Sequence, residues 1–338
     1  MTTTNVNIIG LGRDVYKGLP TTLCAGCGHN SITNHLIKAL YEYGVEPHNL
    51  AKMSGIGCSS KTPAYFAEQA HGFNGLHGRM PSAATGAKLA NRNLLVLGIS
   101  GDGDTASIGL GQYAHLVRRN VDCVYIIENN GVYGLTKGQF SATADPGSTL
   151  KNGSPNQYAT IDVCSLAIEL GGSFVARSFS GDGKQLVPLL QAAFSHRGTA
   201  VIDIVSPCVT FNDHEGSTKS YTYLKDHEMV ANMPDFVPSR AEVTVDYEPG
   251  TAQDIELEDG SHIVLRKVDR DYDATDANGA LATIQQSRSR GEFLTGLLFA
   301  DPSVPDLCAK ERLTATPLKD LREEQLRIKR DAWDELFE

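Results

Sequence analysis

The chain has 338 residues, enough for one large domain or two ordinary ones, and it can bury a sizeable core without staples. Its 41% hydrophobic and 21% charged residues are typical of a globular protein, and its net charge of −10 argues against broad nucleic-acid binding and against an anionic membrane surface. We find neither a signal-peptide pattern nor a stretch long enough to span a bilayer, and therefore expect a cytoplasmic protein.

Apolar periodicity predicts alternating helices and strands as far as residue 205. Residues 31–43 are expected to form a helix that Gly44 terminates, and residues 82–91 a short alanine-rich helix. The elements expected after these, in chain order, are strand 94–100, helix 105–119, strand 122–127, helix 163–170, strand 173–177, helix 186–195 and strand 200–205. This alternation predicts an α/β fold with a doubly wound, mostly parallel sheet that helices cover on both faces.

The pattern changes after strand 200–205, which we take as the last strand of that sheet. Strand-like alternation on both sides of Asp259-Gly260 is a strong signal for a β-hairpin. Residues 318–338 have the charge pattern of an amphipathic helix that is solvated or faces a partner. We therefore divide the chain into a cofactor-binding domain, residues 1–210, and a C-terminal extension of hairpin and helices, residues 211–338, that packs on the core or on a partner subunit.

A short acidic motif, Gly101-Asp102-Gly103-Asp104, lies where strand 94–100 ends and a helix begins, and Asn129-Asn130 follows the next strand. In a doubly wound sheet, ligands bind at these carboxyl ends, and a helix N-terminus with glycines offers N–H groups to a phosphate. One interpretation is a dinucleotide-binding loop, because Gly101, Gly103 and Ala106 fit its spacing. Another is that both segments are plain turns.

The charge of the motif favours a third interpretation, a diphosphate bridged by a metal ion. The carboxylates of Asp102 and Asp104 would repel phosphate unless a divalent cation lay between them, and Mg²⁺ prefers oxygen ligands. Gly-Asp-Gly followed about thirty residues later by Asn-Asn resembles the diphosphate-binding motif of thiamine-diphosphate enzymes. By that resemblance, Asp102, the side chain of Asn130 and the carbonyl of Val132 bind Mg²⁺.

The seven cysteines do not suggest a disulfide framework, because their number is odd and we expect a cytoplasmic chain. Cys24-Ala-Gly-Cys27 alone is compatible with a redox pair, half of a zinc site or two cluster ligands. Cys123 and Cys164 lie in apolar patterns typical of core cysteines, and Cys308 fits either environment. The cysteines expected in loops form a candidate set of four thiolates for zinc or an iron–sulfur cluster: Cys24, Cys27, Cys58 and Cys208.

Several motifs occur together in one order along the chain. They are Cys-x-x-Cys-Gly-His at residues 24–29, Gly-Ile-Gly-Cys-Ser at 55–59, His-Gly-Arg at 77–79, Gly-Asp-Gly at 101–103 and Asn-Asn-x-x-Tyr-Gly-Leu-Thr-Lys at 129–137. Together they resemble the thiamine-binding β subunit of the 2-oxoacid:ferredoxin oxidoreductases, most of all the 2-oxoglutarate branch. The likeness covers about residues 23–208, and residues 259–273 resemble the C-terminal extension of that branch.

The resemblance implies a [4Fe–4S] cluster on the four loop cysteines, with thiamine diphosphate beside it. It carries over a set of cofactor contacts: Ile56, Gly57, Cys58, Ser59, His77, Gly103, Asp104 and Leu135. The implied reaction is the coenzyme A-dependent oxidative decarboxylation of a 2-oxoacid, with electrons passed singly to ferredoxin. For 2-oxoglutarate the products are succinyl-CoA and CO₂, and the CO₂-fixing direction is equally compatible. Besides His77, we take Lys61 and Lys137 as catalytic candidates that pair with a substrate carboxylate.

One part of a thiamine site is missing from the sequence. Thiamine enzymes need a carboxylate that activates the aminopyrimidine, held by a second α/β domain, and we find no further strand–helix alternation after residue 205. We therefore predict that a partner α subunit supplies this glutamate, in an assembly of the (αβ)₂ type. Pyruvate or a branched 2-oxoacid as substrate, a thiamine-dependent decarboxylase without redox function, and a non-catalytic subunit with a dead site stay open as alternatives.

Overall fold

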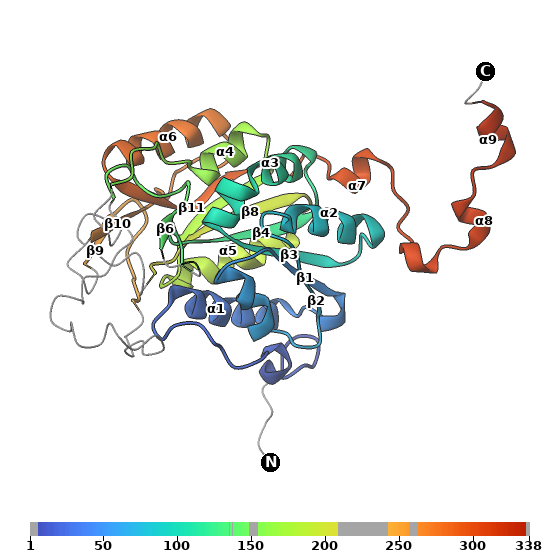
Figure 1. Cartoon of the computed structure of the whole chain (residues 1–338), viewed down its shortest axis with the longest axis horizontal. Helices are drawn as coiled ribbons and strands as arrows, with labels where there is room; N and C mark the ends of the chain where they lie inside the picture. The colour runs from blue at the N-terminus through green and yellow to red at the C-terminus, as the bar shows by residue number, and fades with distance from the viewer. Residues whose placement is uncertain are drawn as a thin grey trace, which may run out of the picture.

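The structure, a computed structural model, describes residues 6–134, 136, 138–148, 155–208, 243–256 and 262–335. One sheet of nine strands runs through it in the order β2-β1-β3-β4-β8-β7-β11-β10-β9 (Figure 1). The bounds of its strands are β1 (Leu50–Ser54), β2 (His71–Asn74), β3 (Leu95–Gly101), β4 (Cys123–Asn129), β7 (Phe174–Phe179), β8 (Thr199–Val205), β9 (Ala252–Glu256), β10 (His262–Lys267) and β11 (Glu292–Ala300). All neighbours from β2 to β7 pair in parallel, which confirms the predicted doubly wound, mostly parallel sheet.

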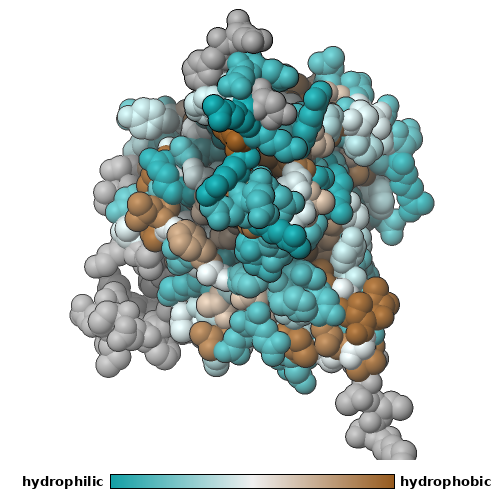
Figure 2. Space-filling view, turned by 90° about the vertical axis from the view of Figure 1, so that its right-hand side faces the viewer, coloured by the Kyte–Doolittle hydropathy of each residue, from teal (hydrophilic) through white to brown (hydrophobic). Residues whose placement is uncertain are grey.

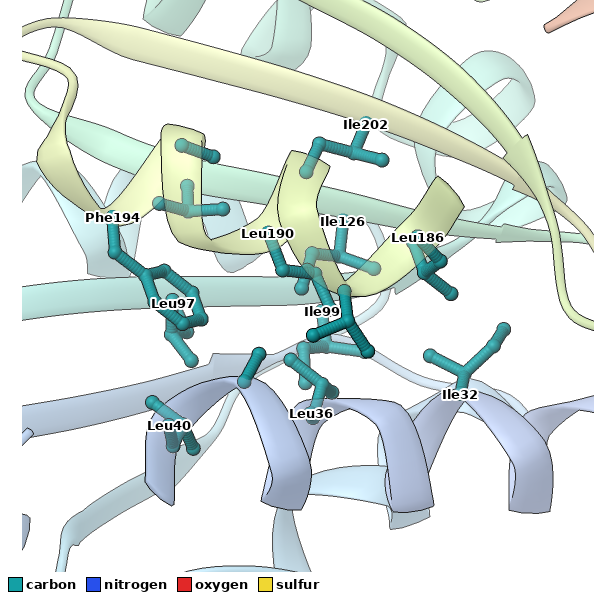
Figure 3. Packing of buried hydrophobic residues seen from close by; sticks show 14 of the residues in the cluster. Ile32, Leu36, Leu40, Leu97, Ile99, Ile126, Leu186, Leu190, Phe194 and Ile202 are labelled. Carbon is teal, nitrogen blue, oxygen red and sulfur yellow. The ribbon is translucent and has the colours of Figure 1, made fainter. Parts of the chain in front are cut away.

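Helices cover both faces of the sheet (Figure 1). On one face lie α1 (Gly28–Tyr43) and α5 (Gly183–Ser195), and on the other α2 (Met80–Ala90), α3 (Leu110–Arg119), α4 (Val163–Glu169) and α6 (Ala277–Ser289). Successive side chains of β4 alternate between the two layers, because Val124 and Ile126 pack with α1 and α5 whereas Cys123 and Tyr125 pack with the other helices. Figure 3 shows the first layer, where Leu36 of α1 lies close to the strand side chains.

The predicted end of the first long helix is confirmed. Gly44 adopts the left-handed conformation, with φ of 77°, and its N–H donates to the carbonyls of Leu40 and Tyr41. The shorter pieces of structure connect the main elements: η1 (Arg13–Tyr16), η2 (Pro47–Asn49), η3 (Ser59–Tyr65), η4 (Gly103–Ile108), β5 (Val132–Tyr133), β6 (Gln139–Phe140), α7 (Leu307–Lys310), η6 (Leu318–Asp320), α8 (Glu323–Leu326) and α9 (Arg330–Asp334). No helix in the described ranges has the length and apolar character needed to cross a bilayer.

The expected helix 105–119 is interrupted. A π-helical turn, η4, comes first, and α3 begins only after Gly109. The N–H of Gly109 donates to the carbonyl of Asp104 at 2.9 Å, and a Cβ on Gly109 would lie 2.9 Å from Cα of Gly78. The wider turn therefore lets the segment around Gly78 pass directly against the start of this helix.

The sheet does not stop at strand 200–205, so that expectation is wrong. β11 pairs antiparallel with β7, and β10 and β9 extend the sheet beyond it. The predicted hairpin strands are present as β9 and β10, whereas Asp259-Gly260 lies outside the described residues. Because this pairing joins segments more than a hundred residues apart, local periodicity gave no sign of it. The division of the chain at residue 210 stays a prediction.

The tail 318–338 is not one amphipathic helix. Its described part holds only the short pieces η6, α8 and α9, and it leaves the body of the molecule (Figure 1). Leu326 and Trp333 are 56% and 50% exposed, so the tail buries little apolar surface that would support a longer helix. Figure 2 looks onto the side from which the tail leaves, where hydrophobic side chains form separate patches in a mostly hydrophilic surface.

Strand β1 was not predicted from the sequence, although it carries part of the site. All five of its residues are buried, and Lys52 at its centre interrupts the apolar run. The ammonium of Lys52 donates to the carbonyls of Pro63, Phe66 and Ala67 at 2.6 to 2.9 Å. Burial lowers the pKa of Lys52 to about 8. This lysine thus ties the end of η3 to β1 and shapes the loop between them.

Candidate functional site

A cavity opens at the carboxyl edge of the sheet, where β1, β3 and β4 end. It measures about 90 Å³. Ten of the residues predicted for the site line it: Ile56, Gly57, Cys58, Ser59, His77, Asp102, Gly103, Asp104, Asn130 and Val132. Parallel pairing of β1 with β3 and of β3 with β4 brings these segments together; the motif positions predict the convergence of the β3 and β4 ends, whereas the part of β1 was not predicted.

Asp102 directly follows β3 and is 1% exposed. Its Oδ2 accepts hydrogen bonds from the hydroxyls of Ser141 and Thr143, the latter at 2.7 Å. Its Oδ1 accepts a longer one, 3.3 Å, from the N–H of Asn130. Oδ1 therefore keeps more acceptor capacity toward the cavity than Oδ2 does.

Asn130 and Val132 are also linked to each other. The N–H of Val132 donates to Oδ1 of Asn130 at 3.1 Å, and both residues are buried in the wall of the cavity. A carboxylate, an amide oxygen and a backbone carbonyl at one cavity are the donor types that Mg²⁺ takes in proteins. Asp102, Asn130 and Val132 therefore fit the predicted metal by chemistry and by position.

Asp104 holds three segments together. Its carboxylate accepts from the N–H of Gly78 at 2.7 Å, from the N–H of Ile56 at 3.3 Å and from the hydroxyl of Ser100 at 2.6 Å. Nδ1 of His77 lies at hydrogen-bond distance from the same carboxylate. Asp104 thus fixes the loop after β1 and the loop that carries His77 against the end of β3.

Gly103 separates the two aspartates and faces an aromatic ring. A Cβ at Gly103 would lie 2.5 Å from the ring of Tyr133, so only glycine fits without moving that ring. The hydroxyl of Tyr133 donates to the carbonyl of Gly103 at 3.1 Å, and its ring meets His77 edge-on at 6.1 Å. Glycine at this position therefore lets the Tyr133 ring pack directly against the turn between the two aspartates.

The four candidate cysteines come from three places near this edge. Cys27 caps α1 and Cys24 precedes it, Cys58 caps η3, and Cys208 follows β8. Burial, with the neighbouring Cys208 and Cys24, raises the pKa of Cys58 to about 11, and burial together with Cys208 raises the pKa of Cys27. Cys208 and Cys24 therefore lie near both Cys27 and Cys58, although in the part of the chain that the structure describes no group of three or more histidine, cysteine, aspartate or glutamate side chains is placed to hold a metal ion.

Comparison with known proteins agrees with this geometry. Residues 55–204 match the family described as thiamine pyrophosphate enzyme, C-terminal TPP binding domain. The 2-oxoacid:ferredoxin oxidoreductase subunit beta of a Sulfolobus species is 43% identical over 216 residues, which are 64% of this chain and 70% of that one. The 2-oxoglutarate synthase subunit KorB of Methanocaldococcus jannaschii is 36% identical over 63% of this chain and 80% of its own length.

A solved structure is similar over nearly the whole chain. It is described as 2-oxoglutarate:ferredoxin oxidoreductase from Magnetococcus marinus with 2-oxoglutarate, coenzyme A and succinyl-CoA bound. The identity is 31%, the TM-score is 0.71, and the alignment covers 89% of this chain and 90% of that one. The chain belongs to the β-subunit family of the 2-oxoacid:ferredoxin oxidoreductases.

Of the two lysines predicted for this β subunit, the structure describes Lys61. Lys61 is half-buried on η3, and its ammonium lies 3.5 Å from the hydroxyl of Thr22. It acts on Cys58, whose pKa it lowers slightly against the larger effect of burial, but among the described residues it is not part of the cavity wall. Leu135 and Lys137 lie outside the described residues.

Sequence reasoning missed a buried acid and histidine in the β subunit's cavity. Glu128 is 0% exposed, and burial raises its pKa well above the usual range while the hydroxyl of Thr62, at 2.9 Å, lowers it. Nε2 of His29 lies 3.7 Å from Glu128, Nδ1 lies 2.8 Å from the hydroxyl of Ser206, and burial lowers the pKa of His29 to about 4. The sequence feature that could have indicated Glu128 is its position: it is an acidic residue at the end of an apolar run, directly before Asn129.

Proposed function

We propose that this chain is the β subunit of a 2-oxoglutarate:ferredoxin oxidoreductase, which acts with an α subunit. The observation that carries the proposal is the cavity at the carboxyl edge, where Asp102, Asn130 and Val132 face the loop of Cys58. The names of the relatives from Methanocaldococcus jannaschii and Magnetococcus marinus support 2-oxoglutarate as the substrate. A cytoplasmic location stays a prediction from the sequence.

The cofactor half of the proposal rests on donor chemistry. Asp102, Asn130 and the carbonyl of Val132 would hold Mg²⁺, and the bare backbone at Gly103 would receive the diphosphate of thiamine diphosphate. The chemistry that thiamine diphosphate would supply here is a nucleophilic carbon for the keto group and an electron sink for decarboxylation. Asp104 keeps Ile56 and His77 in place around that cofactor through its hydrogen bonds.

The redox half of the proposal rests on the cysteines. Cys24, Cys27, Cys58 and Cys208 would hold one [4Fe–4S] cluster, and thiolate is the usual ligand of such clusters. Cys58 lines the cavity as well as belonging to this set, which supports electron transfer between cofactor and cluster. In balance, 2-oxoglutarate and coenzyme A give succinyl-CoA, CO₂, one proton and two electrons, and the electrons reduce two molecules of ferredoxin singly.

The size of the cavity supports a partner subunit. Ligand pockets usually measure roughly 300–1,000 Å³, whereas the described part of this chain encloses about 90 Å³. At this cavity the described part of the chain therefore encloses less space than a whole cofactor fills, which supports the proposal that the α subunit completes the site with its catalytic glutamate. The (αβ)₂ stoichiometry belongs to the proposal.

The proposal is tested with the β chain co-purified anaerobically with its α subunit. We expect a broad visible iron–sulfur absorption that bleaches on reduction, bound thiamine diphosphate and Mg²⁺, and ferredoxin reduction that depends on coenzyme A and is fastest with 2-oxoglutarate. Cys58→Ser should remove the visible absorption, whereas Cys123→Ala, in the core of the sheet, should keep it. Faster turnover of pyruvate, or an unchanged spectrum in Cys58→Ser, would contradict the proposal.

A further inference from the structure

A line of buried hydrogen bonds leads from Asp102 to residues that are not in the wall of its cavity. Oγ1 of Thr143 lies 2.7 Å from Oδ2 of Asp102 and 3.0 Å from Oδ1 of Asn129. Nδ2 of Asn129 donates to Oδ1 of Asp203 at 3.0 Å, and Nε of Arg177 donates to Oδ2 of Asp203 at 2.8 Å. We call Thr143, Asn129, Asp203 and Arg177 the Asp102 relay.

The relay is buried throughout, so it is not a surface network. None of its residues is more than 4% exposed. Hydrogen bonds and ion pairs in such a place are little screened by water or salt, and an unpaired member would be costly. We therefore expect the hydrogen bonds of the relay to depend on one another, so that the loss of one member weakens the others.

Arg177 is the fixed end of the relay. Its Nη2 also donates to Asp162 at 2.8 Å, so two carboxylates compensate its charge. Burial would lower the pKa of Arg177, but Asp162 and Asp203 outweigh burial and hold that pKa well above its usual range. The guanidinium is thus permanently charged, and it fixes the orientation of the Asp203 carboxylate.

The orientation passes from Asp203 to Asp102 through Asn129 and Thr143. Asn129 must turn its amide nitrogen to Asp203, and this leaves its Oδ1 facing Thr143. The single hydroxyl proton of Thr143 is shared between two acceptors in a three-centre hydrogen bond, in which the ionised carboxylate at 2.7 Å is the stronger acceptor and the amide oxygen of Asn129 at 3.0 Å is the weaker one. With Ser141 as a second donor, Oδ2 of Asp102 is occupied.

Position separates the relay from direct ligands. Thr143, Asn129, Asp203 and Arg177 line a different cavity, of about 520 Å³, and are not in the wall of the cavity that Asp102 and Asn130 share. Among the proposed metal ligands, Thr143 donates a hydrogen bond to Asp102, so Thr143 acts on a bound cation through another residue rather than as a ligand.

We infer that the Asp102 relay positions the Asp102 carboxylate for the metal, by holding Oδ2 so that Oδ1 is the oxygen presented to the cation. The inference rests on the proposed function, because it assumes that Asp102 is a metal ligand. Thr143 and Asn129 are positioning residues in this arrangement. Groups that orient a metal ligand in this way typically account for about 10–100-fold in metal affinity.

The test is a calorimetric titration of the metal-stripped αβ complex with Mg²⁺ in the presence of thiamine diphosphate. We expect Thr143→Val to weaken Mg²⁺ binding by about 10–100-fold, and Thr143→Ser, which keeps the hydroxyl, to restore it. Asn129→Ala should weaken binding too, and the double variant should be no worse than Thr143→Val because both act through one path. The matched control is Thr199→Val, which removes a buried hydroxyl bonded to the carbonyl of Val121 at 2.8 Å, at the far end of β8.

The possible results distinguish a failure of the relay from a failure of the proposed function. If Thr143→Val binds Mg²⁺ as tightly as the unchanged complex, or if Thr199→Val weakens it equally, the relay does not position Asp102. If Thr143→Ser fails to recover binding although its thermal unfolding matches the unchanged complex, the hydroxyl is not the active group and the inference also fails. If the unchanged complex itself takes up neither Mg²⁺ nor thiamine diphosphate, the proposed function falls and the relay with it.

Discussion

Replacing Gly103 with alanine adds one carbon atom and tests directly how closely the Tyr133 ring packs on the candidate site. In Gly103→Ala the new Cβ would lie 2.5 Å from Cε1 and 2.7 Å from Cζ of Tyr133. Carbon atoms normally pack at about 3.5–4.0 Å, so the ring must move by about 1 Å. Such a shift disturbs the hydrogen bond from Tyr133 to Gly103 and the edge-on contact with His77. Displacements of this size cost on the order of 100-fold in function, and overpacking costs about 1–3 kcal/mol of stability.

The assay is the affinity of the αβ complex for thiamine diphosphate in saturating Mg²⁺, measured by calorimetry beside thermal unfolding. Gly111→Ala in α3 is the matched control, because nothing lies within 4 Å of a Cβ there, and we expect it to stabilise the helix by about 0.5–1 kcal/mol with unchanged affinity. Tyr133→Leu combined with Gly103→Ala makes room for the methyl group and should recover part of the binding. Equal affinities for both alanine variants, or no recovery in the double variant, would refute the steric reasoning.

Three further predictions address other parts of the molecule. The sequence predicts that Lys61 pairs with the substrate carboxylate remote from the reacting carbon, so Lys61→Met should raise KM for 2-oxoglutarate far more than KM for pyruvate; equal changes in steady-state assays would contradict this. Burial lowers the pKa of His196 from its ordinary value of 6.5, so the unfolded chain takes up a proton first as the pH falls; the chain should therefore lose unfolding free energy between pH 7 and pH 5 relative to His196→Gln in denaturant titrations, and equal losses in both chains would contradict this. Removing residues 317–338 should leave the melting temperature of the purified β chain nearly unchanged, whereas a drop of several degrees would mean that the tail packs on the body.

The central strands could be predicted because their residues alone determine them. β3, β4 and β8 are apolar over most of their length and buried on both faces, which is typical of the central strands of a parallel sheet in an α/β fold. The positions of Asp102 and Asn130 followed, since motif residues at the ends of neighbouring parallel strands must meet at one edge. Ten of the sixteen residues singled out for the site line one cavity, and those from residues 56–59 and His77 were predicted from the family resemblance rather than from the strand pattern.

What failed to be predicted depends on contacts between distant segments. β1 was missed because Lys52 is buried with three carbonyl partners that only the folded chain provides. β11 inserts antiparallel beside β7, and no local period encodes such a partner. The π-helical turn at η4 depends on the close passage of Gly78 past Gly109. In each case the local sequence permits several structures, and tertiary packing selects one.

The strand order also explains why the functional groups of this subunit support one another across long sequence distances. β4 lies between β3 and β8, so residues at its end contact residues from both neighbours. Asn130 therefore meets Asp102 on one side, and Asn129 meets Asp203 on the other. The two neighbouring residues at the end of β4 therefore have different partners. Asn130 faces the cavity, whereas Asn129 faces the buried ion pairs of Arg177. A doubly wound sheet can in this way connect the Asp102 carboxylate at the end of β3 to the permanent charge of Arg177 on β7, three strands away, and the adjacent Asn129 and Asn130 are the local sequence feature that makes the connection.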